Sequence, residues 1–308
     1  MKNKRKDKIK QILKYLESQD IHENTQAIDI KENLFFFKSI QFFSSFILWY
    51  FRYAFKKNNS KIAEFTDFCN EQFNAEFYVS LAKLERGFFP GLIKPLVKRI
   101  QKKIRDEKIA TVLVLGSGPM EIERQIISNL IKNKNKKPYC FIGIDQSKSA
   151  QQAAISNLEE LKDNVQFIKC NAMDIEKMIR KTQENNKIYT IILCNDDVFS
   201  LQKNENDYKF DLVVSSLFIH HLDEKQKVKF EQIVLTLSDN IIEYDGYRKP
   251  LVFLLQTLFT WRNPILMNGA AFSNLRYEKK KTLKQISKKW KMKFFLKGTY
   301  IKEFCSKG

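Results

Sequence analysis

The chain has 308 residues and 44% of them are hydrophobic, so it is long enough for one doubly wound α/β domain with an additional segment. A formal net charge of +19 makes nucleic acid or an anionic membrane a candidate partner, but lysine predominates over arginine and we favour a lysine-rich solvated surface. Five scattered cysteines without a Cys-x-x-Cys pair, and only three histidines, argue against a disulfide framework and a metal site. We therefore expect no metal and a reducing, cytoplasmic location.

Residues 1–105 are predicted to form a helical N-terminal cap or lid. Within it, residues 34–55 contain 11 aromatic residues. Lys38 and Arg52 leave 13 uncharged residues between them, fewer than the ~20 that a membrane-spanning helix requires. Three interpretations stay open: a helix buried in a lid over the active site, a helix lying in the interface at the inner face of a membrane, and a true span.

The stretch Thr111–Ile122, TVLVLGSGPMEI, has the pattern of a strand, a turn and a helix. The apolar run Val112–Leu115 predicts a buried strand, and Gly116-Ser117-Gly118-Pro119 predicts a tight turn. Helical spacing begins at Glu121. This arrangement brings backbone N–H groups and the positive end of a helix close to a ligand.

Further apolar runs predict strands, and several end in polar residues that suit a ligand site. They are Tyr139–Ile144 before Asp145 and Gln146, Val165–Cys170 before Asn171-Ala172-Met173-Asp174, Phe210–Val214 before Ser215 and Ser216, Asn240–Asp245, and the terminal hairpin Lys293–Leu296 with Tyr300–Phe304. The strand-like run Tyr189–Leu193 lies in a long insert, residues 176–209, to which no role is assigned.

The series VLVLGSGP, GIDQS, NAMD and FDLVVSSLFIHHL resembles the class I S-adenosylmethionine-dependent methyltransferases, from about Ile109 to the C-terminus. The resemblance implies an α/β fold over residues 106–308, a doubly wound, Rossmann-like sheet of seven strands closed by an antiparallel strand. Two positions depart from the family pattern: Val114 replaces its acid and Met120 its third glycine. A dinucleotide-binding fingerprint would need a glycine where Glu121 stands.

The resemblance also implies S-adenosyl-L-methionine as the cofactor and a set of residues around it. By position, Gly116, Ser117 and Gly118 would face its methionine part, Asp145 and Gln146 its ribose and adenine, Asn171, Ala172 and Met173 the adenine amine, and Ser215 and Ser216 the reactive methyl.

His220 is the candidate catalytic residue, since a histidine there could take a proton from a hydroxyl acceptor. The alternative is that it packs at the start of the following helix. After the fifth strand, Tyr247 and Arg248 are candidate acceptor-binding residues together with Glu243 and Asp245. A salt-bridged strand end explains the two acids equally well.

The predicted activity is methyl transfer to the oxygen or carbon of a small aromatic or lipophilic acceptor. The segment after the fourth strand lacks the Asp/Asn-Pro-Pro-aromatic tetrad of amino-methylating nucleic-acid enzymes, and no cysteine precedes a proline as in cytosine-C5 enzymes. One alternative is an RNA methyltransferase, which the charge favours. The other is a non-catalytic, membrane-associated Rossmann-like protein, which Val114 and Met120 favour.

Overall fold

The computed structural model describes residues 90–134, 137–183, 189–203, 208–247, 273, 277, 280, 283–284, 290–295 and 299–305. Most of the predicted cap, the aromatic segment 34–55 and Arg248 lie outside the described residues. Apart from Ser273, the described residues belong to one compact unit, Asn74–Lys249 with Arg276–Gly308. None of the described helices is long and apolar enough to cross a membrane.

Helices and strands alternate along this unit. The helices are α5 (Pro90–Asp106), α6 (Glu121–Lys132), α7 (Lys148–Leu158), α8 (Ile175–Gln183) and α9 (Glu224–Leu237), with short 3-10 turns η3 (Glu159–Leu161), η4 (Ala172–Asp174), η5 (Val198–Lys203) and η6 (Ile219–His221). The strands are β1 (Thr111–Leu115), β2 (Tyr139–Ile144), β3 (Val165–Cys170), β4 (Tyr189–Cys194), β5 (Leu212–Ser216), β6 (Asn240–Gly246), β7 (Lys291–Phe294) and β8 (Thr299–Cys305).

The described strands form one sheet in the order β3-β4-β2-β1-β5-β6-β8-β7. Every neighbouring pair from β3 to β6 is parallel, whereas β8 runs antiparallel to both β6 and β7. The chain begins at β1 in the middle, builds one half of the sheet and then returns to β5 on the other side of β1. The doubly wound, Rossmann-like sheet with an antiparallel strand next to one edge is thereby confirmed.

The sheet has eight strands, not the seven that we expected, and the extra strand changes the neighbour of β2. Val165–Cys170 was predicted as the third strand in chain order, and Tyr189–Leu193 as a strand-like run in an insert. In the structure β4, from the predicted insert, pairs along its whole length with β2 on one side and with β3 on the other. The run assigned to the insert is thus a full strand of the sheet, which the expected seven strands did not include.

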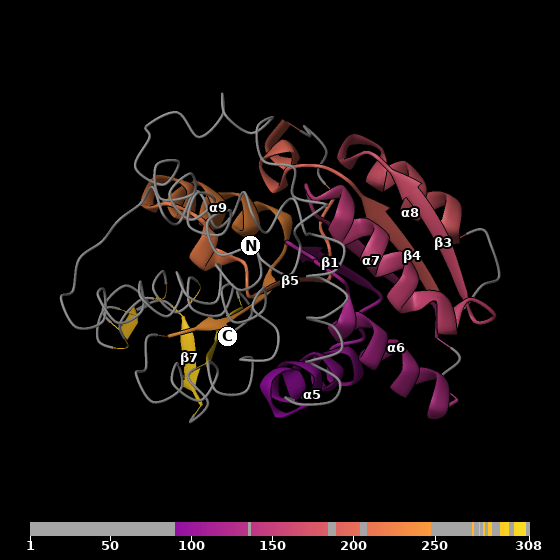
Figure 1. Cartoon of the computed structure of the whole chain (residues 1–308), viewed down its shortest axis with the longest axis horizontal. Coiled ribbons are helices and arrows are strands. Elements are labelled where there is room, and N and C mark those ends of the chain that lie inside the picture. Colours follow the sequence, from indigo (N-terminus) through magenta and orange to yellow (C-terminus); the bar gives the residue numbers. More distant parts are fainter. Residues whose placement is uncertain are drawn as a thin grey trace, which may run out of the picture. The chain divides into compact units, whose positions relative to one another are not determined.

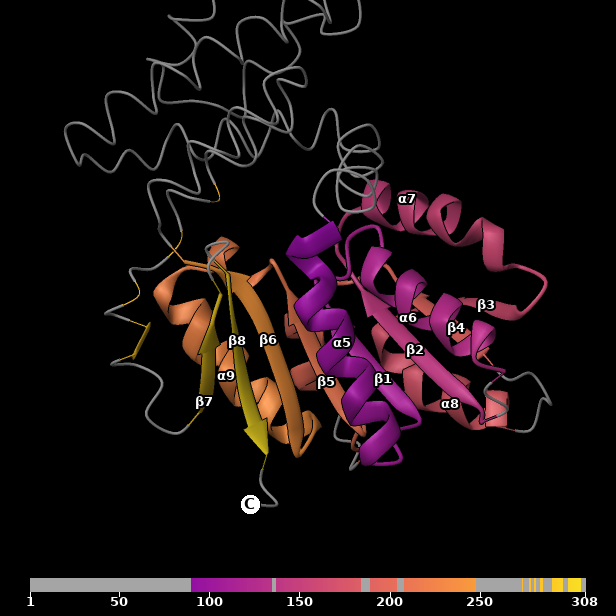
Figure 2. The same ribbon diagram turned by 90° about the horizontal axis from the view of Figure 1, so that it is seen from below.

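Both faces of the sheet are covered, which explains why the strands read as continuous apolar runs. In β1, Val112 and Val114 belong to a core cluster with α5, α6 and α7, whereas Leu113 and Leu115 belong to a cluster with α8 and α9. Figures 1 and 2 show these two helical layers on opposite sides of the sheet.

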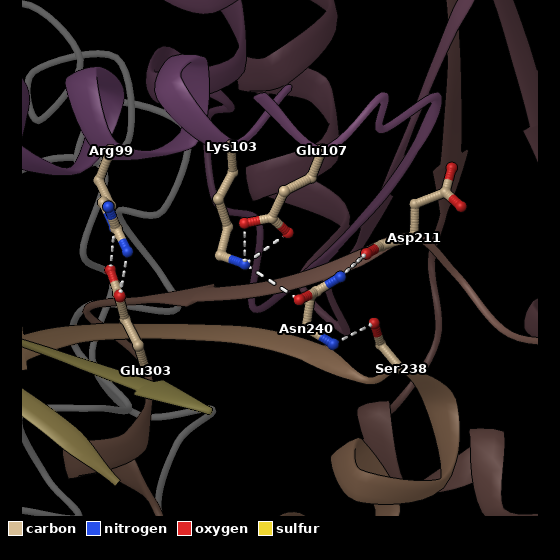
Figure 3. A network of polar contacts seen from close by, with 7 residues as sticks. All are labelled: Arg99, Lys103, Glu107, Asp211, Ser238, Asn240 and Glu303. Atoms are coloured by element: carbon tan, nitrogen blue, oxygen red, sulfur yellow. Dashed lines mark hydrogen bonds and ion pairs between the residues drawn. The ribbon is translucent and has the colours of Figure 1, made fainter. Parts of the chain in front are cut away.

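Helix α5 lies within the predicted cap, yet it packs as part of the α/β domain. Its residues Ile93, Leu96 and Ile100 are buried in the same core cluster as β1. Figure 3 shows the polar contacts that attach the helix to the amino edge of the sheet. The buried Lys103 ammonium donates to both carboxylate oxygens of Glu107, each at 2.8 Å, and to the Asn240 amide oxygen at 3.0 Å.

Two further contacts complete this attachment. The Asn240 amide donates to the Asp211 carbonyl at 3.1 Å, which joins the beginning of β6 to the residue before β5. Arg99 on α5 forms a two-pronged ion pair with Glu303 on β8. These contacts hold α5 against the amino-terminal ends of the strands. The division into a cap of residues 1–105 and a following domain stays a prediction.

Candidate active site

The turn after β1 takes the left-handed backbone conformation that its glycines allow. Gly116 has φ 65° and Gly118 has φ 51°. The N–H groups of Gly116 and Ser117 donate to the Ile144 carbonyl at 2.9 and 3.0 Å, so the turn is fixed to the end of β2. A Cβ on Gly116 would lie 2.4 Å from the Phe218 ring, so glycine is required there by packing as well as by φ.

Met120, at the position of the expected third glycine, also adopts a left-handed conformation, with φ 54°. Its side chain is fully buried and belongs to the core cluster beneath α6. A Cβ on Gly143 of β2 would lie 3.0 Å from the Met120 sulfur and 2.9 Å from the Ser117 hydroxyl. The small residue on β2 thus makes room for the methionine, and the departure at position 120 is accommodated in the core.

Asp145 directly follows the last residue of β2, and its carboxylate is hydrogen-bonded to this turn. Its carboxylate accepts the Gly118 N–H on Oδ2 and the Ser147 N–H on Oδ1, both at 2.9 Å. Burial raises the pKa of Asp145, and the hydrogen bonds from Ser147 and Gly118 partly offset that rise. A carboxylate oxygen can accept two hydrogen bonds, so each oxygen keeps the capacity to accept one from a ligand hydroxyl.

The residues after β4 lie against this acid, and sequence reasoning missed them. The Asn195 amide donates to the carbonyls of Asp145 and Gln146, at 3.0 and 2.9 Å. The Asp145 N–H in turn donates to the Cys194 carbonyl at 3.1 Å. The signal was present as an apolar run that ends in Asn195-Asp196-Asp197, but it was assigned to an insert.

The three residues predicted to flank the adenine amine follow β3, one strand further from β2. Ala172 is buried and its N–H donates to the Asp196 carboxylate at 3.3 Å. Asn171 is exposed, and Met173 is 69% exposed. Their contact with a cofactor stays a prediction, and the structure places the end of β4 between them and Asp145.

Ser215, at the end of β5, is buried and its hydroxyl has no hydrogen-bond partner. It lies between its register partners Leu115 on β1 and Glu243 on β6. A buried polar atom left without a partner costs ~1–3 kcal/mol. Such an atom at the point where the sheet reverses its winding is typical of a ligand site. Ser216, the next residue, is half-buried.

His220 forms a buried dyad with Asp245, which lies 25 residues further along the chain. The His220 Nδ1 and the Asp245 Oδ1 are 2.8 Å apart, and Asp245 Oδ2 accepts the backbone N–H of His220 at 2.9 Å. Since the carboxylate accepts from Nδ1, we assign the proton to Nδ1 and the lone pair to Nε2. Tyr277 packs edge-on against the imidazole with ring centres 4.8 Å apart.

The remaining candidates after β6 have structural partners. The buried Glu243 carboxylate forms an ion pair of 2.9 Å with Lys302 on β8, so the simpler explanation, a salt-bridged strand end, holds for this acid. Tyr247 donates its hydroxyl to the Phe295 carbonyl at 2.9 Å, on the terminal hairpin. Contact of Tyr247 and Arg248 with an acceptor stays a prediction. Among the described residues, no group of three or more His, Cys, Asp or Glu side chains could hold a metal.

Comparison with known proteins gives structural likenesses only. No protein-family model and no curated protein matches the sequence. The methyltransferase domain of a bacterial Hen1 is 14% identical and aligns over 70% of this chain and 99% of its own, with a TM-score of 0.43. The plantazolicin methyltransferase BamL, solved with SAH and a substrate analogue, is 14% identical over 83% of this chain and 77% of its own, with a TM-score of 0.40.

A third likeness is the magnesium protoporphyrin IX methyltransferase ChlM of Synechocystis PCC 6803, solved with SAH, at 11% identity over 69% of this chain and 83% of its own, with a TM-score of 0.38. Because these identities and TM-scores are low, we describe the fold by its strand order and register and not by these likenesses. That order, with a reversed strand beside one edge, is a doubly wound, Rossmann-like arrangement, and apart from one additional strand it is the arrangement that the sequence resemblance to the class I S-adenosylmethionine-dependent methyltransferases implies.

Proposed function

We propose that the protein is an S-adenosylmethionine-dependent methyltransferase that binds its cofactor across the carboxyl ends of β1, β2, β4 and β5. The observation that carries this proposal is the Asp145 carboxylate, half-buried at the end of β2 and hydrogen-bonded to the glycine turn that begins at Gly116. A carboxylate in this position suits two neighbouring ribose hydroxyls, because both can donate to it. The unpartnered Ser215 hydroxyl also fits a ligand at this edge.

The end of β4 supplies the surface for the adenine. Asn195 fixes the backbone of Asp145 and Gln146, and Asp196 and Asp197 follow it directly. Because β4 is the neighbour of β2, these residues replace Asn171, Ala172 and Met173 as our first choice for contact with the adenine. The turn Gly116–Gly118 then faces the methionine part, and Ser215 with Ser216 lines the methyl group.

The acceptor is proposed to be a small aromatic or lipophilic compound with a reactive hydroxyl. When bound, the cofactor supplies a methyl group that its sulfonium already activates. His220 would take the acceptor's proton at Nε2, while Asp245 holds the imidazole by its Nδ1–H in one tautomer and orientation. These roles of His220 and Asp245 favour O-methylation, since a buried acid–histidine pair is suited to removing a proton from an oxygen.

Isothermal titration with S-adenosylmethionine tests the cofactor site. We expect wild type to bind with a Kd in the range of ~1 μM to ~1 mM, where substrates usually bind enzymes. Asp145→Ala removes two hydrogen bonds to a charged group, each worth ~1.5–3 kcal/mol, and should weaken binding by well over tenfold. The matched control is Asp163→Ala, at an exposed aspartate in the loop before β3, which should bind as wild type does. Absence of heat with wild type would favour the non-catalytic alternative.

A second candidate function, methylation of RNA, draws on one observation. Three exposed lysines, Lys94, Lys98 and Lys102, recur every four residues along α5 and so share one face of the helix. RNA held by several such contacts would dissociate steeply as salt increases, whereas a small acceptor would not. RNA binding with a strong salt dependence, weakened by Lys98→Glu, would support this alternative.

The aromatic segment, which lies outside the described residues, bears on location. Residues 34–55 are proposed to contact either the acceptor or the inner face of a membrane. Flotation with anionic liposomes, with and without this segment, distinguishes the two, because only a membrane-interface helix would carry the protein to the lipid fraction.

A further inference from the structure

Two cysteines face each other where β3 and β4 end. Cys170 and Cys194 are the last residues of these parallel strands and are register partners. Their sulfur atoms lie 3.2 Å apart, in a thiol–thiol hydrogen bond. Cys170 is half-buried on the outermost strand, whereas Cys194 is buried. The proposed function makes no use of this pair.

The backbone already has the geometry that a disulfide requires. Neighbouring strands lie ~4.8 Å apart and register partners point to the same face. A disulfide needs Cα atoms about 4.4–6.8 Å apart and sulfur atoms about 2.05 Å apart. From the present 3.2 Å the sulfurs must approach by about 1.2 Å, which small side-chain rotations can supply.

The two thiols differ in acidity and access. The hydrogen bond from Cys194 lowers the pKa of Cys170, although burial opposes this. The same hydrogen bond raises the pKa of Cys194, and burial raises it further. Since the thiolate is the reactive form, Cys170 is the attacking cysteine and Cys194 the resolving one.

We propose that Cys170 and Cys194 are a modification site, a dithiol that a peroxide converts into a reversible cross-strand disulfide. The Cys170 thiolate attacks one oxygen of hydrogen peroxide, the O–O bond breaks, and the second oxygen leaves and becomes water on protonation. The Cys194 sulfur then attacks the resulting sulfenic acid, the S–O bond breaks, and hydroxide leaves as water with the Cys194 proton. Two thiols are oxidised and one peroxide is reduced to two waters. A small-molecule thiol reverses the bond by exchange.

The disulfide is coupled to the site at the end of β2, and this step rests on the proposed function. The Cys194 carbonyl accepts the Asp145 N–H, and the next residue, Asn195, holds the Asp145 and Gln146 carbonyls. Because side-chain rotation closes the bond, the coupling comes from the restraint that the disulfide places on Cys194 at the end of β4, which disturbs these contacts and the carboxylate that is proposed to hold the ribose. Oxidation should therefore weaken S-adenosylmethionine binding by about 5-fold or more, the lower end of typical couplings between sites.

Peptide mapping tests the disulfide without any cofactor. Trypsin cleaves after Lys169, Lys177, Lys187 and Lys203, which places each cysteine in a peptide of its own, residues 170–177 and 188–203. After mild peroxide treatment of the full-length protein, we expect these two peptides to be joined, and dithiothreitol to separate them. Cys170→Ser should abolish the joined pair, whereas Cys305→Ser, at an exposed cysteine on β8, should leave it intact.

Two results would overturn the proposal. One is Cys170 oxidised to the sulfinic acid with Cys194 still a free thiol, and the other is either cysteine joined to a different partner. Titration of the reduced and oxidised proteins with S-adenosylmethionine then separates the two claims. Loss of affinity on oxidation in wild type, but not in Cys170→Ser, supports the coupling, and equal affinity of both forms refutes it. If even reduced wild type does not bind the cofactor, the proposed function fails while the mapped disulfide stands.

Discussion

The buried acid Glu123 makes stability depend on pH in a direction that can be measured. It lies in the first turn of α6, is only 2% exposed, and has a pKa raised from 4.5 to about 7, mainly by burial and also by the nearby Glu121. Between these two values the folded protein holds a proton that the unfolded chain has lost. Stability therefore falls as pH rises through this window, by 7 − 4.5 = 2.5 pKa units at ~1.36 kcal/mol each, or about 3 kcal/mol.

Glu123→Gln removes this cost, because the amide stays neutral at every pH and has nearly the same shape. Urea unfolding followed by circular dichroism should show the variant about 3 kcal/mol more stable than wild type at pH 8. Near pH 5 most of the difference should disappear, because there Glu123 is protonated in the folded wild type as well. A Glu123→Gln variant less stable than wild type at pH 8 would refute the reasoning, since it would mean that the acid is ionised and paired.

Glu121, two residues earlier on the same helix, is the matched control. Burial opposes its ionisation, but hydrogen bonds from Arg124, Gln125 and Asn157 outweigh burial, and its pKa is lowered. Its ionised form is therefore the stabilising one, with a contribution present above its unfolded pKa and lost as pH falls through the folded value. Glu121→Gln should lower stability at pH 8, opposite in sign to Glu123→Gln.

Three other variants test the site and the fold. His220→Gln should lower kcat by ~100-fold or more with the Kd for S-adenosylmethionine unchanged, and Asp245→Asn should act in the same sense by releasing the imidazole, both measured by methyl-transfer kinetics and titration. Gly116→Ala should lower the unfolding free energy by ~1–3 kcal/mol, because its Cβ meets the Phe218 ring at 2.4 Å. Lys103→Met leaves the polar groups around it without their donor and should cost ~1–3 kcal/mol in urea unfolding, with cofactor affinity unchanged because it lies at the amino edge.

Many strands of the sheet could be predicted from local sequence patterns. Runs such as Val112–Leu115 and Tyr139–Ile144 are apolar throughout because both faces of the sheet are covered, and their strand assignment was confirmed. The glycine turn was also predictable, because its backbone requires φ values that few other residues adopt. The antiparallel terminal hairpin was confirmed as well.

The order of strands in the sheet and the contacts between residues far apart in the chain were not predicted from local sequence patterns. Tyr189–Cys194 is the more apolar run and is buried throughout, whereas Val165–Cys170 carries Gln166 and Lys169 and forms the edge strand, a difference that was not used in the prediction. The contact between His220 and Asp245 depends on β5 and β6 lying side by side, and only the three-dimensional structure brings the two residues together. Asn195, Asp196 and Asp197 were missed because the strand that precedes them was assigned to an insert.

We propose that S-adenosylmethionine lies across the carboxyl ends of the parallel strands with its ribose on Asp145. A crystal structure of the protein with S-adenosylhomocysteine tests this most directly. We expect both ribose hydroxyls within hydrogen-bond distance of the Asp145 carboxylate and the adenine beside Asn195–Asp197. A crevice filled by side chains, or a nucleoside held elsewhere on the protein, would contradict it.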